Sequence, residues 1–476
     1  MAATHDPFPT LRIRRDGLQP RGVYAVNQAR YLAPDPAAVA RLQAALVAGQ
    51  AGVVAHFYMD PELQGVLAAC DWPHIHVSDS LVMADRAVEM VRAGAKRVAV
   101  LGVDFMSENV RAMLDAAGLQ DVPVHRVATD PIGCSLAEAA DALAYGAYLQ
   151  QAAATPRALH VVYINTSLLA KARASALVPT ITCTSSNVVR TVLQTFAQVE
   201  GAHVFFGPDT YMGRNLRTLF EGAVALGDEA CRALHPAHDA ASVRDALTRL
   251  HHFEQGACVV HHLFGAEVVR RVRAEHPDAL YSAHLEVPGE MFALAADAAR
   301  QGRGVVGSTS NILHFIEAQV AARAADARDG EVLEVVLGTE AGMITPIVRS
   351  VQAMLARAGS GLAVDVIFPV AADAVAVTDD DELGIVPGVL GGEGCSTAGG
   401  CATCPYMKMN TLQGLCEVLE TDDEAGALDA FRPRTYAQSI VGRTVAAVGS
   451  EPILAMRAFS RDGALPDALV ARIVGG

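Results

Sequence analysis

The sequence predicts an α/β protein built from three pseudo-symmetric three-layer αβα domains, whose parallel sheets surround a central cavity. Three observations lead to this fold class. The 476 residues suffice for about three domains of ~150 residues each. Apolar, strand-like runs alternate with alanine-rich segments of helical character, as in three-layer α/β domains. The same order of polar segments occurs three times, and a period near one domain length indicates a triplicated domain rather than a solenoid.

Each copy contains the same series of segments. A first apolar run ends in a polar triplet, at His56–Tyr58, Tyr163–Asn165 and His284–Glu286. A second run leads into small hydroxyl residues, at Ser78–Ser80, Thr184–Ser186 and Ser308–Ser310. A third run gives the related segments Leu101–Met106, Phe206–Met212 and Leu337–Met343. Each copy closes on a cysteine after a small or glycine-rich turn, at Cys134, Cys258 and Cys404.

The repeats set the predicted domain boundaries. The first αβα repeat spans residues 35–155, the second 156–275 and the third 276–425, and residues 426–476 form a C-terminal helical extension that packs on the core. The third repeat carries an inserted loop at about 371–400. This loop holds the acidic run Asp379–Glu382 and the glycine-rich segment Gly388–Gly400. Because long irregular insertions are commonly functional loops, we expect it to be mobile and to lie over or near the last cysteine.

The individual elements follow from the apolar pattern. Near-continuous apolar runs are typical of strands buried in parallel sheets. They predict strands at Val53–Ala55, Ile75–Val77, Arg97–Leu101, His160–Tyr163, Pro179–Cys183 and His203–Phe206. Amphipathic alanine-rich segments predict helices over Pro61–Cys70 and Leu81–Ala93, and one long helix over Ser135–Gln151 that starts directly after Cys134.

Composition excludes some classes of function. The net charge of −15 argues against a nucleic-acid partner, for which clustered lysine and arginine would be expected. Residues 1–20 contain charges and prolines but no apolar signal-peptide core, and no 18-residue apolar run predicts a membrane span. Nine cysteines without the spacing of a secreted framework suit reduced thiols. We therefore expect a cytoplasmic protein.

The triplets and hydroxyl segments are predicted to lie beyond the carboxyl ends of parallel strands, where open α/β sheets bind ligands. In a three-fold arrangement these ends face one pocket. Hydroxyl residues before helices suit an anion, because the backbone N–H groups and dipole at a helix start favour negative charge. Plain helix capping is the alternative for any single loop. The predicted pocket residues are His56, Tyr58, Ser80, Tyr163, Asn165, Ser185, His284, Glu286, Ser308 and Thr309.

The cysteines indicate a metal centre. Three widely separated thiolates at Cys134, Cys258 and Cys404 suit a [4Fe–4S] cluster in which one iron lacks a protein ligand. Such an iron is a Lewis acid that can bind a substrate oxygen. Cys401 could supply a fourth ligand, or it could pair with Cys395 as a redox-sensitive dithiol. The remaining thiols are predicted to be core residues: Cys70, Cys183, Cys231 and Cys416.

Several segments, taken together and in order from about residue 50 to 415, resemble those of the quinolinate synthase family. They are Ala55–Tyr58, Asp79–Leu81, Gly102–Met106, Cys134–Ala137, Val162–Thr166, Cys183–Asn187, Gly307–Ser310 and Cys404–Leu412. The resemblance implies a [4Fe–4S] transferase of de novo NAD (pyridine nucleotide) biosynthesis. It condenses iminoaspartate with dihydroxyacetone phosphate and gives quinolinate, phosphate and water. An aspartate oxidase or dehydrogenase is the implied supplier of the imine.

Carried over by motif, the cluster ligands are Cys134, Cys258 and Cys404, and the pocket residues are those named above. The sequence departs from the family pattern in three places, one of which is the insertion before Cys395, longer than in compact members of the family. The family's His-Pro-Glu-Cys element is His284-Leu285-Glu286-Val287 here, so that cysteine cannot be a ligand. The glutamine that usually follows the first triplet is Met59.

The residues expected to move protons are Glu286 and His284, with Tyr58 beside His56 as a second pair. Residues two apart share one strand face and can be coupled. Tyr163 and Asn165 would orient the substrate. Two other functions remain open at this point: another [4Fe–4S] hydro-lyase of the aconitase type, and a non-catalytic iron–sulfur redox sensor that uses Cys395 and Cys401 as a switch.

Overall fold

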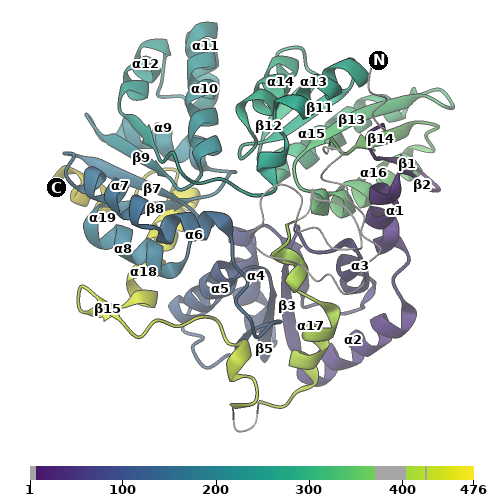
Figure 1. Cartoon of the computed structure of the whole chain (residues 1–476), viewed down its shortest axis with the longest axis horizontal. Helices are drawn as coiled ribbons and strands as arrows, with labels where there is room; N and C mark the ends of the chain where they lie inside the picture. The colour runs from purple at the N-terminus through teal and green to yellow at the C-terminus, as the bar shows by residue number, and fades with distance from the viewer. Residues whose placement is uncertain (1–6, 370–403, 424–425, 476) are drawn as a thin grey trace.

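The computed structural model describes residues 7–369, 404–423 and 426–475. Within these ranges the strands form three large sheets and one two-stranded ribbon. In Figure 1 the three sheets, each with its own helices, lie around the middle of the molecule. The first is drawn in purple, the second in blue and teal, and the third in teal to green, apart from its two N-terminal strands, which are dark purple. The expected mixed α/β architecture with parallel sheets is confirmed. The predicted insertion at 371–400, Cys395 and Cys401 lie outside the described residues.

The first sheet is wholly parallel, in the order β4-β3-β5-β6. Helix α2 begins with the Asp35 carboxylate accepting the Ala37 N–H and with a proline in the first turn, a favourable helix start. The elements are α2 (Pro36–Gly49), β3 (Ala51–His56), α3 (Pro61–Ala69), β4 (Ile75–Ser78), α4 (Ser80–Arg92), β5 (Arg97–Leu101), α5 (Asp104–Ala116) and β6 (Val124–Arg126).

The second sheet is also parallel, in the order β10-β9-β7-β8. The single helix predicted over 135–151 is wrong, because Ala142 adopts an extended conformation (φ −71°, ψ 153°) and divides it into two helices. The elements are α6 (Ser135–Asp141), α7 (Leu143–Ala153), β7 (Ala158–Tyr163), α8 (Leu168–Leu177), β8 (Thr180–Cys183), α9 (Val188–Gln198), β9 (His203–Gly207), α10 (Thr210–Leu226), α11 (Asp228–Leu234), α12 (Ala240–Thr248) and β10 (Leu250–His252).

The third sheet has the order β12-β11-β13-β14-β1-β2. Its first four strands are parallel, but β1 pairs antiparallel with β14 and β2 pairs antiparallel with β1, so the N-terminal region adds two strands that were not predicted. The elements are β1 (Thr10–Arg14), β2 (Gly17–Arg21), α1 (Val23–Gln28), η1 (Ala29–Leu32), η2 (His261–Leu263), α13 (Ala266–Glu275), β11 (Leu280–His284), α14 (Gly289–Ala299), β12 (Gly304–Gly307), α15 (Thr309–Ala324), β13 (Val332–Gly338), η3 (Ala341–Met343), α16 (Ile344–Ala358) and β14 (Ala363–Ile367).

The C-terminal part of the chain returns to the first two sheets. Helix α17 packs on α2 and β5, and α18 packs on α8 and β8. These elements are η5 (Met407–Met409), α17 (Leu412–Glu420), η7 (Asp429–Phe431), β15 (Ser439–Ile440), β16 (Arg443–Thr444), α18 (Val445–Asp462) and α19 (Asp467–Gly475). Across the described residues, no helix is both long and apolar enough to span a bilayer.

Candidate active site

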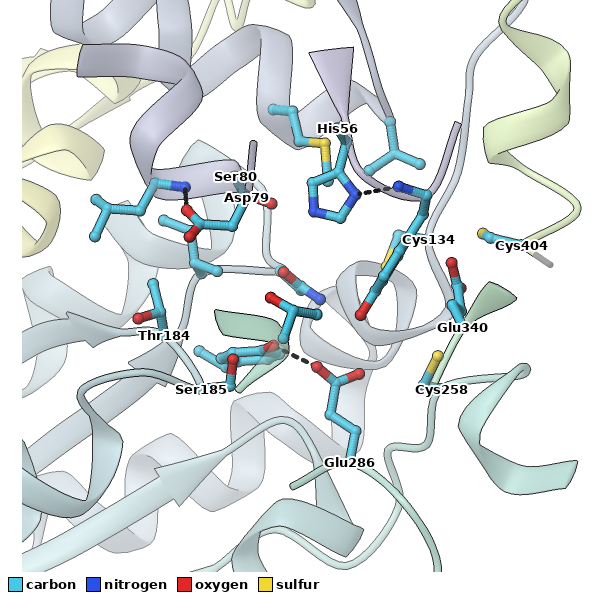
Figure 2. Close-up of a pocket in the computed structure, with 18 of the residues that line it drawn as sticks. His56, Asp79, Ser80, Cys134, Thr184, Ser185, Cys258, Glu286, Glu340 and Cys404 are labelled. Carbon is cyan, nitrogen blue, oxygen red and sulfur yellow. Dashed lines mark hydrogen bonds between the residues drawn. The ribbon is translucent and has the colours of Figure 1, made fainter. Parts of the chain in front are cut away.

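A cavity lies where the carboxyl ends of strands from the three sheets meet. Residues that follow β3, β4 and β5, residues that follow β7 and β8, and residues that follow β11, β12 and β13 all line it. The open space measures about 80 Å³. Figure 2 shows polar side chains converging on this cavity from several elements. This location agrees with the general preference of open α/β sheets for ligands at the carboxyl ends of their strands.

Most of the residues predicted for the site line this one cavity. They are His56, Tyr58, Ser80, Tyr163, Asn165, Ser185, His284, Glu286, Thr309, Cys134, Cys258 and Cys404. Ser308 is not among the lining residues and instead caps α15. Its hydroxyl donates to Asn311 Oδ1 at 2.7 Å and accepts the Asn311 N–H at 3.3 Å.

Two buried histidines use the same nitrogen in the same way. His56 Nδ1 accepts the Tyr58 backbone N–H at 3.2 Å, and His284 Nδ1 accepts the Glu286 N–H at 3.4 Å. Burial lowers the pKa of His56 to about 3 and that of His284 to about 4, so both rings are neutral near pH 7. A neutral ring whose Nδ1 accepts must carry its proton on Nε2. The Nε2–H group of each ring is therefore left to act as a hydrogen-bond donor.

Glu286 is the most strongly engaged carboxylate of the site. Burial raises its pKa, but His261, His284 and the Tyr163 hydroxyl outweigh burial and lower it to about 2. Tyr163 donates its hydroxyl hydrogen to Glu286 Oε1, and His261 Nδ1 lies 3.1 Å from Glu286 Oε2. Burial also raises the pKa of the Tyr58 and Tyr163 hydroxyls, which keeps both protonated. The cavity thus contains an ionised carboxylate beside neutral proton donors.

The three hydroxyl loops are not equivalent. At the start of α4 the Asp79 carboxylate accepts the N–H groups of Leu81 and Val82, both at 3.0 Å. These two amides therefore already have an acceptor within the protein. At the start of α15 Ser308 fills the same role. Helix α9 begins without a side-chain cap, and the buried Thr184 hydroxyl beside it has no partner among the described residues.

The three predicted ligand cysteines lie close to one another. Burial raises the pKa of each thiol, for Cys134 to about 12, and Cys404 interacts electrostatically with both Cys134 and Cys258. Backbone N–H groups point at each sulfur and oppose this rise: Leu136 and Ala137 at Cys134, His261 at Cys258, and Tyr406 and Met407 at Cys404. Figure 2 shows these cysteines on one side of the cavity and Thr184 and Ser185 on the other.

Residues of the site that were not among those predicted include Asp79, Thr184, His261 and Glu340. The Glu340 side chain is buried in the cavity wall, and burial followed by the nearby Glu286 charge raises its pKa. Ligand atoms of Cys258, His261 and Glu286 lie within 4.8 Å of one another, so this group could hold a metal ion. The repeat offered a signal for Glu340, because it occupies the third repeated segment, where the other copies carry Asp104 and Asp209.

The model of the protein family described as "Quinolinate synthetase A protein" matches residues 39–357. Curated relatives named "Quinolinate synthase, chloroplastic" match nearly the whole chain. The relative from Nicotiana tabacum is 51% identical over 98% of this chain and 66% of its own length. The relative from Oryza sativa subsp. japonica is 48% identical over 99% of this chain and 70% of its own length. The relative from Arabidopsis thaliana is 50% identical over 98% of this chain and 67% of its own length. The chain thus spans about two thirds of the length of these relatives.

These relatives correct one expectation. The absence of a signal-peptide core and the reduced thiols predicted a cytoplasmic protein. The relatives from Nicotiana tabacum, Oryza sativa subsp. japonica and Arabidopsis thaliana are named chloroplastic, which overturns that prediction. Thiol chemistry and N-terminal composition report on redox conditions and secretion, and they do not distinguish the cytoplasm from an organelle with reducing contents.

Proposed function

Because the chain belongs to the quinolinate synthetase A family, we propose that it is a quinolinate synthase. It condenses iminoaspartate with dihydroxyacetone phosphate and releases quinolinate, phosphate and water, in the de novo route to NAD. The observation that carries the proposal is the convergence of nearly all of the motif residues on one cavity. An aspartate oxidase or dehydrogenase is the proposed source of the imine.

The proposed cofactor is a [4Fe–4S] cluster held by Cys134, Cys258 and Cys404. The donor set fits such a group, because backbone N–H groups directed at each sulfur favour the thiolate that binds iron. Burial in the cavity wall disfavours the charged form of each of the three thiols. A bound metal cation compensates the free-energy cost of this charge. When bound, a cluster with three cysteine ligands supplies a Lewis-acidic iron with an open position.

The remaining lining residues are proposed to bind and orient the substrates. The Nε2–H donors of His56 and His284 suit substrate carboxylate or carbonyl oxygens. The free helix start at α9, with Ser185 and the unpartnered Thr184 hydroxyl, suits a carboxylate or phosphate. Ser80, Ser308 and Thr309 remain proposed substrate-binding residues, as do Tyr163 and Asn165.

Glu286 is the proposed acid/base group. The reaction needs protons to be taken from carbon and nitrogen and delivered to leaving oxygens. Glu286 is ionised near pH 7 and accepts a hydrogen bond from Tyr163, so its carboxylate has the protonation state that a general base needs, while its low pKa makes it a weak base. Tyr58, which lies edge-on to His56 with ring centroids 4.6 Å apart, is the second candidate. His56 and His284, neutral and fixed through Nδ1, would assist by donating from Nε2.

We further propose that three pseudo-symmetric αβα domains, at 35–155, 156–275 and 276–425, surround the cavity. What supports this is the order of polar segments in the sequence and the parallel strands that precede them in each sheet. Residues 426–476 are proposed to be an extension of this core.

Anaerobic incubation with iminoaspartate and dihydroxyacetone phosphate tests the proposed activity. The expected result is the formation of quinolinate and an equal amount of phosphate. Omission of either substrate is the control. Absence of quinolinate from protein that carries its full complement of iron would reject the proposal, and hydro-lyase activity without condensation would point to an enzyme of the aconitase type.

A further inference from the structure

A second cavity lies between α3, β4 and the start of α16, separate from the central one. Its volume is about 350 Å³, within the range of small-molecule sites. Its lining residues include Phe57, Leu67, Trp72, Ile75, Thr345 and Arg349. None of them lines the central cavity. Phe57 lines the second cavity, whereas its neighbours His56 and Tyr58 line the first.

Two polar residues that line this cavity, Thr345 and Arg349, have no hydrogen-bond or ion-pair partner within the described ranges. Thr345 and Arg349 are one turn apart on α16 and so face the same way. The Thr345 side chain is only 3% exposed, and its hydroxyl makes no hydrogen bond within the described part of the chain. Arg349 is exposed and forms no ion pair with any described carboxylate. Buried polar atoms normally have partners, so an unsatisfied hydroxyl beside a free guanidinium is complementary to a carboxylate.

Most of the other residues that line the cavity are apolar, and two of them are aromatic. The Trp72 indole is held in place because its Nε1–H donates to the Ala51 carbonyl at 2.7 Å. Phe57, Leu67, Ile75 and Val77 supply further apolar surface. A fixed indole and a phenyl ring favour a flat aromatic body over a flexible or strongly hydrated one.

We propose that this cavity is a second binding site, for a small aromatic carboxylate. Arg349 and Thr345 bind the carboxylate, and Phe57 and Trp72 contact the ring. The carboxylate replaces water around a guanidinium that forms no ion pair among the residues that the structure describes, and the ring removes apolar surface from water. A ligand of this size binds with a dissociation constant on the order of 1 mM.

The sequence provides a reporter for this site, because Trp72 is the only tryptophan of the chain. Titration of the iron-loaded protein with benzoate, excited at a wavelength at which neither tyrosine nor benzoate absorbs, should give a saturable change in tryptophan fluorescence. Benzamide, which has the same ring without the charge, should bind at least tenfold more weakly. Equal responses to benzoate and benzamide, or a response that does not saturate, would refute the site.

Substitutions assign the response to the cavity. Arg349→Gln should weaken benzoate binding about tenfold or more, and Thr345→Val, which conserves shape, should weaken it several-fold. Arg357→Gln, on the same helix but outside the cavity, is the matched control and should bind benzoate like the unmodified protein. Benzoate affinity that is unchanged in both Arg349→Gln and Thr345→Val contradicts the proposal. Because Arg349 is exposed, its substitution is expected to leave folding intact.

Discussion

His56 and His284 illustrate how single atoms determine the chemistry of the site. Each ring accepts the backbone N–H of the residue two positions later, and this bond fixes which nitrogen carries the proton. The spacing of His and Tyr or His and Glu is visible in the sequence. The bond itself depends on the turn that follows each strand, so the tautomer could not be predicted from residue types alone.

Glu286→Gln tests the proposed acid/base role. Glutamine keeps the shape of the side chain and can still accept a hydrogen bond from Tyr163, but it cannot take up a proton. We expect quinolinate formation to fall by roughly 10²–10⁴-fold, with iron content unchanged. Glu334→Gln, a half-exposed carboxylate outside the cavity, is the control. Turnover near that of the unmodified protein would remove Glu286 from this role.

His160 links stability to pH. It is fully buried on β7, its Nε2 lies 2.8 Å from the Tyr145 hydroxyl, and burial lowers its pKa to about 3. An unfolded histidine binds a proton below pH ~6.5, whereas this one stays neutral until much lower pH. The contribution of the neutral His160 to the free energy of unfolding is therefore complete above pH ~6.5 and declines as the pH falls towards 3. At pH 5 the loss is about 2 kcal/mol.

Thermal unfolding of His160→Gln at pH 7 and pH 5 checks this expectation. Glutamine cannot ionise, so the variant should lose several degrees less of its melting temperature between pH 7 and pH 5 than the unmodified protein. The quantity to compare between the two proteins is the change in melting temperature from pH 7 to pH 5, because the substitution itself alters packing at both pH values. Equal losses in the two proteins would show that His160 does not contribute to acid sensitivity.

At the scale of elements, Lys171 on α8 holds the turn that carries Asn165. Its side chain is fully buried, and its ammonium group donates to the carbonyl oxygens of Ile164 (3.1 Å) and Thr166. In Lys171→Met these buried carbonyls lose a donor, which costs about 1–3 kcal/mol. We expect a roughly tenfold rise in KM and a lower melting temperature.

Lys96→Met, at an exposed position, provides the comparison for Lys171→Met. Steady-state kinetics and a melting curve on the two variants separate positioning of the turn from a general effect of removing a lysine. A KM within twofold of the unmodified protein for Lys171→Met would exclude the positioning role.

Gly256 allows the turn that carries Cys258 to pack closely against Pro208, which follows a strand of the second sheet. A β-carbon at this position would lie 2.1 Å from the Pro208 carbonyl oxygen. Gly256→Ala must therefore shift the turn, and we expect the iron content to fall to less than half. Gly265→Ala is the control, because nothing lies within 4 Å of the corresponding β-carbon. Iron content that is equal in the two variants would contradict this explanation of the glycine.

The bounds of helices and strands could be predicted from the sequence where the apolar pattern of neighbouring residues is regular. Strand β5 has the predicted bounds, and α4 lies within one residue of its prediction, because their apolar patterns are regular. The break at Ala142 has no such local signal, since alanine favours helix. The pairing of β1 with β14 joins residues more than 350 apart, and the repeat pattern contains no information about it.

At the scale of the whole molecule, the repeat predicted most of the central site. Residues at equivalent places in three copies could be expected to meet once the sheets share a centre, and nearly all of them line one cavity. The repeat did not reveal which helix starts are already capped. Asp79 and Ser308 close two of them, and this depends on side-chain rotamers rather than on residue type. His261 was not predicted, because it lies near Glu286 only in the folded protein and the two residues follow different strands in the sequence.

The central claim is that three thiolates, one from each copy of the repeat, hold one cluster. An anaerobic iron and sulfide count, with absorbance spectra, tests it on variants with Cys134, Cys258 or Cys404 replaced by alanine, and on Cys70→Ala as the control outside the central cavity. We predict about four irons and four sulfides per chain in the unmodified protein and in Cys70→Ala, and loss of the cluster in each of the other three variants. A full cluster in any of those three variants, or no cluster in the unmodified protein, would contradict the claim.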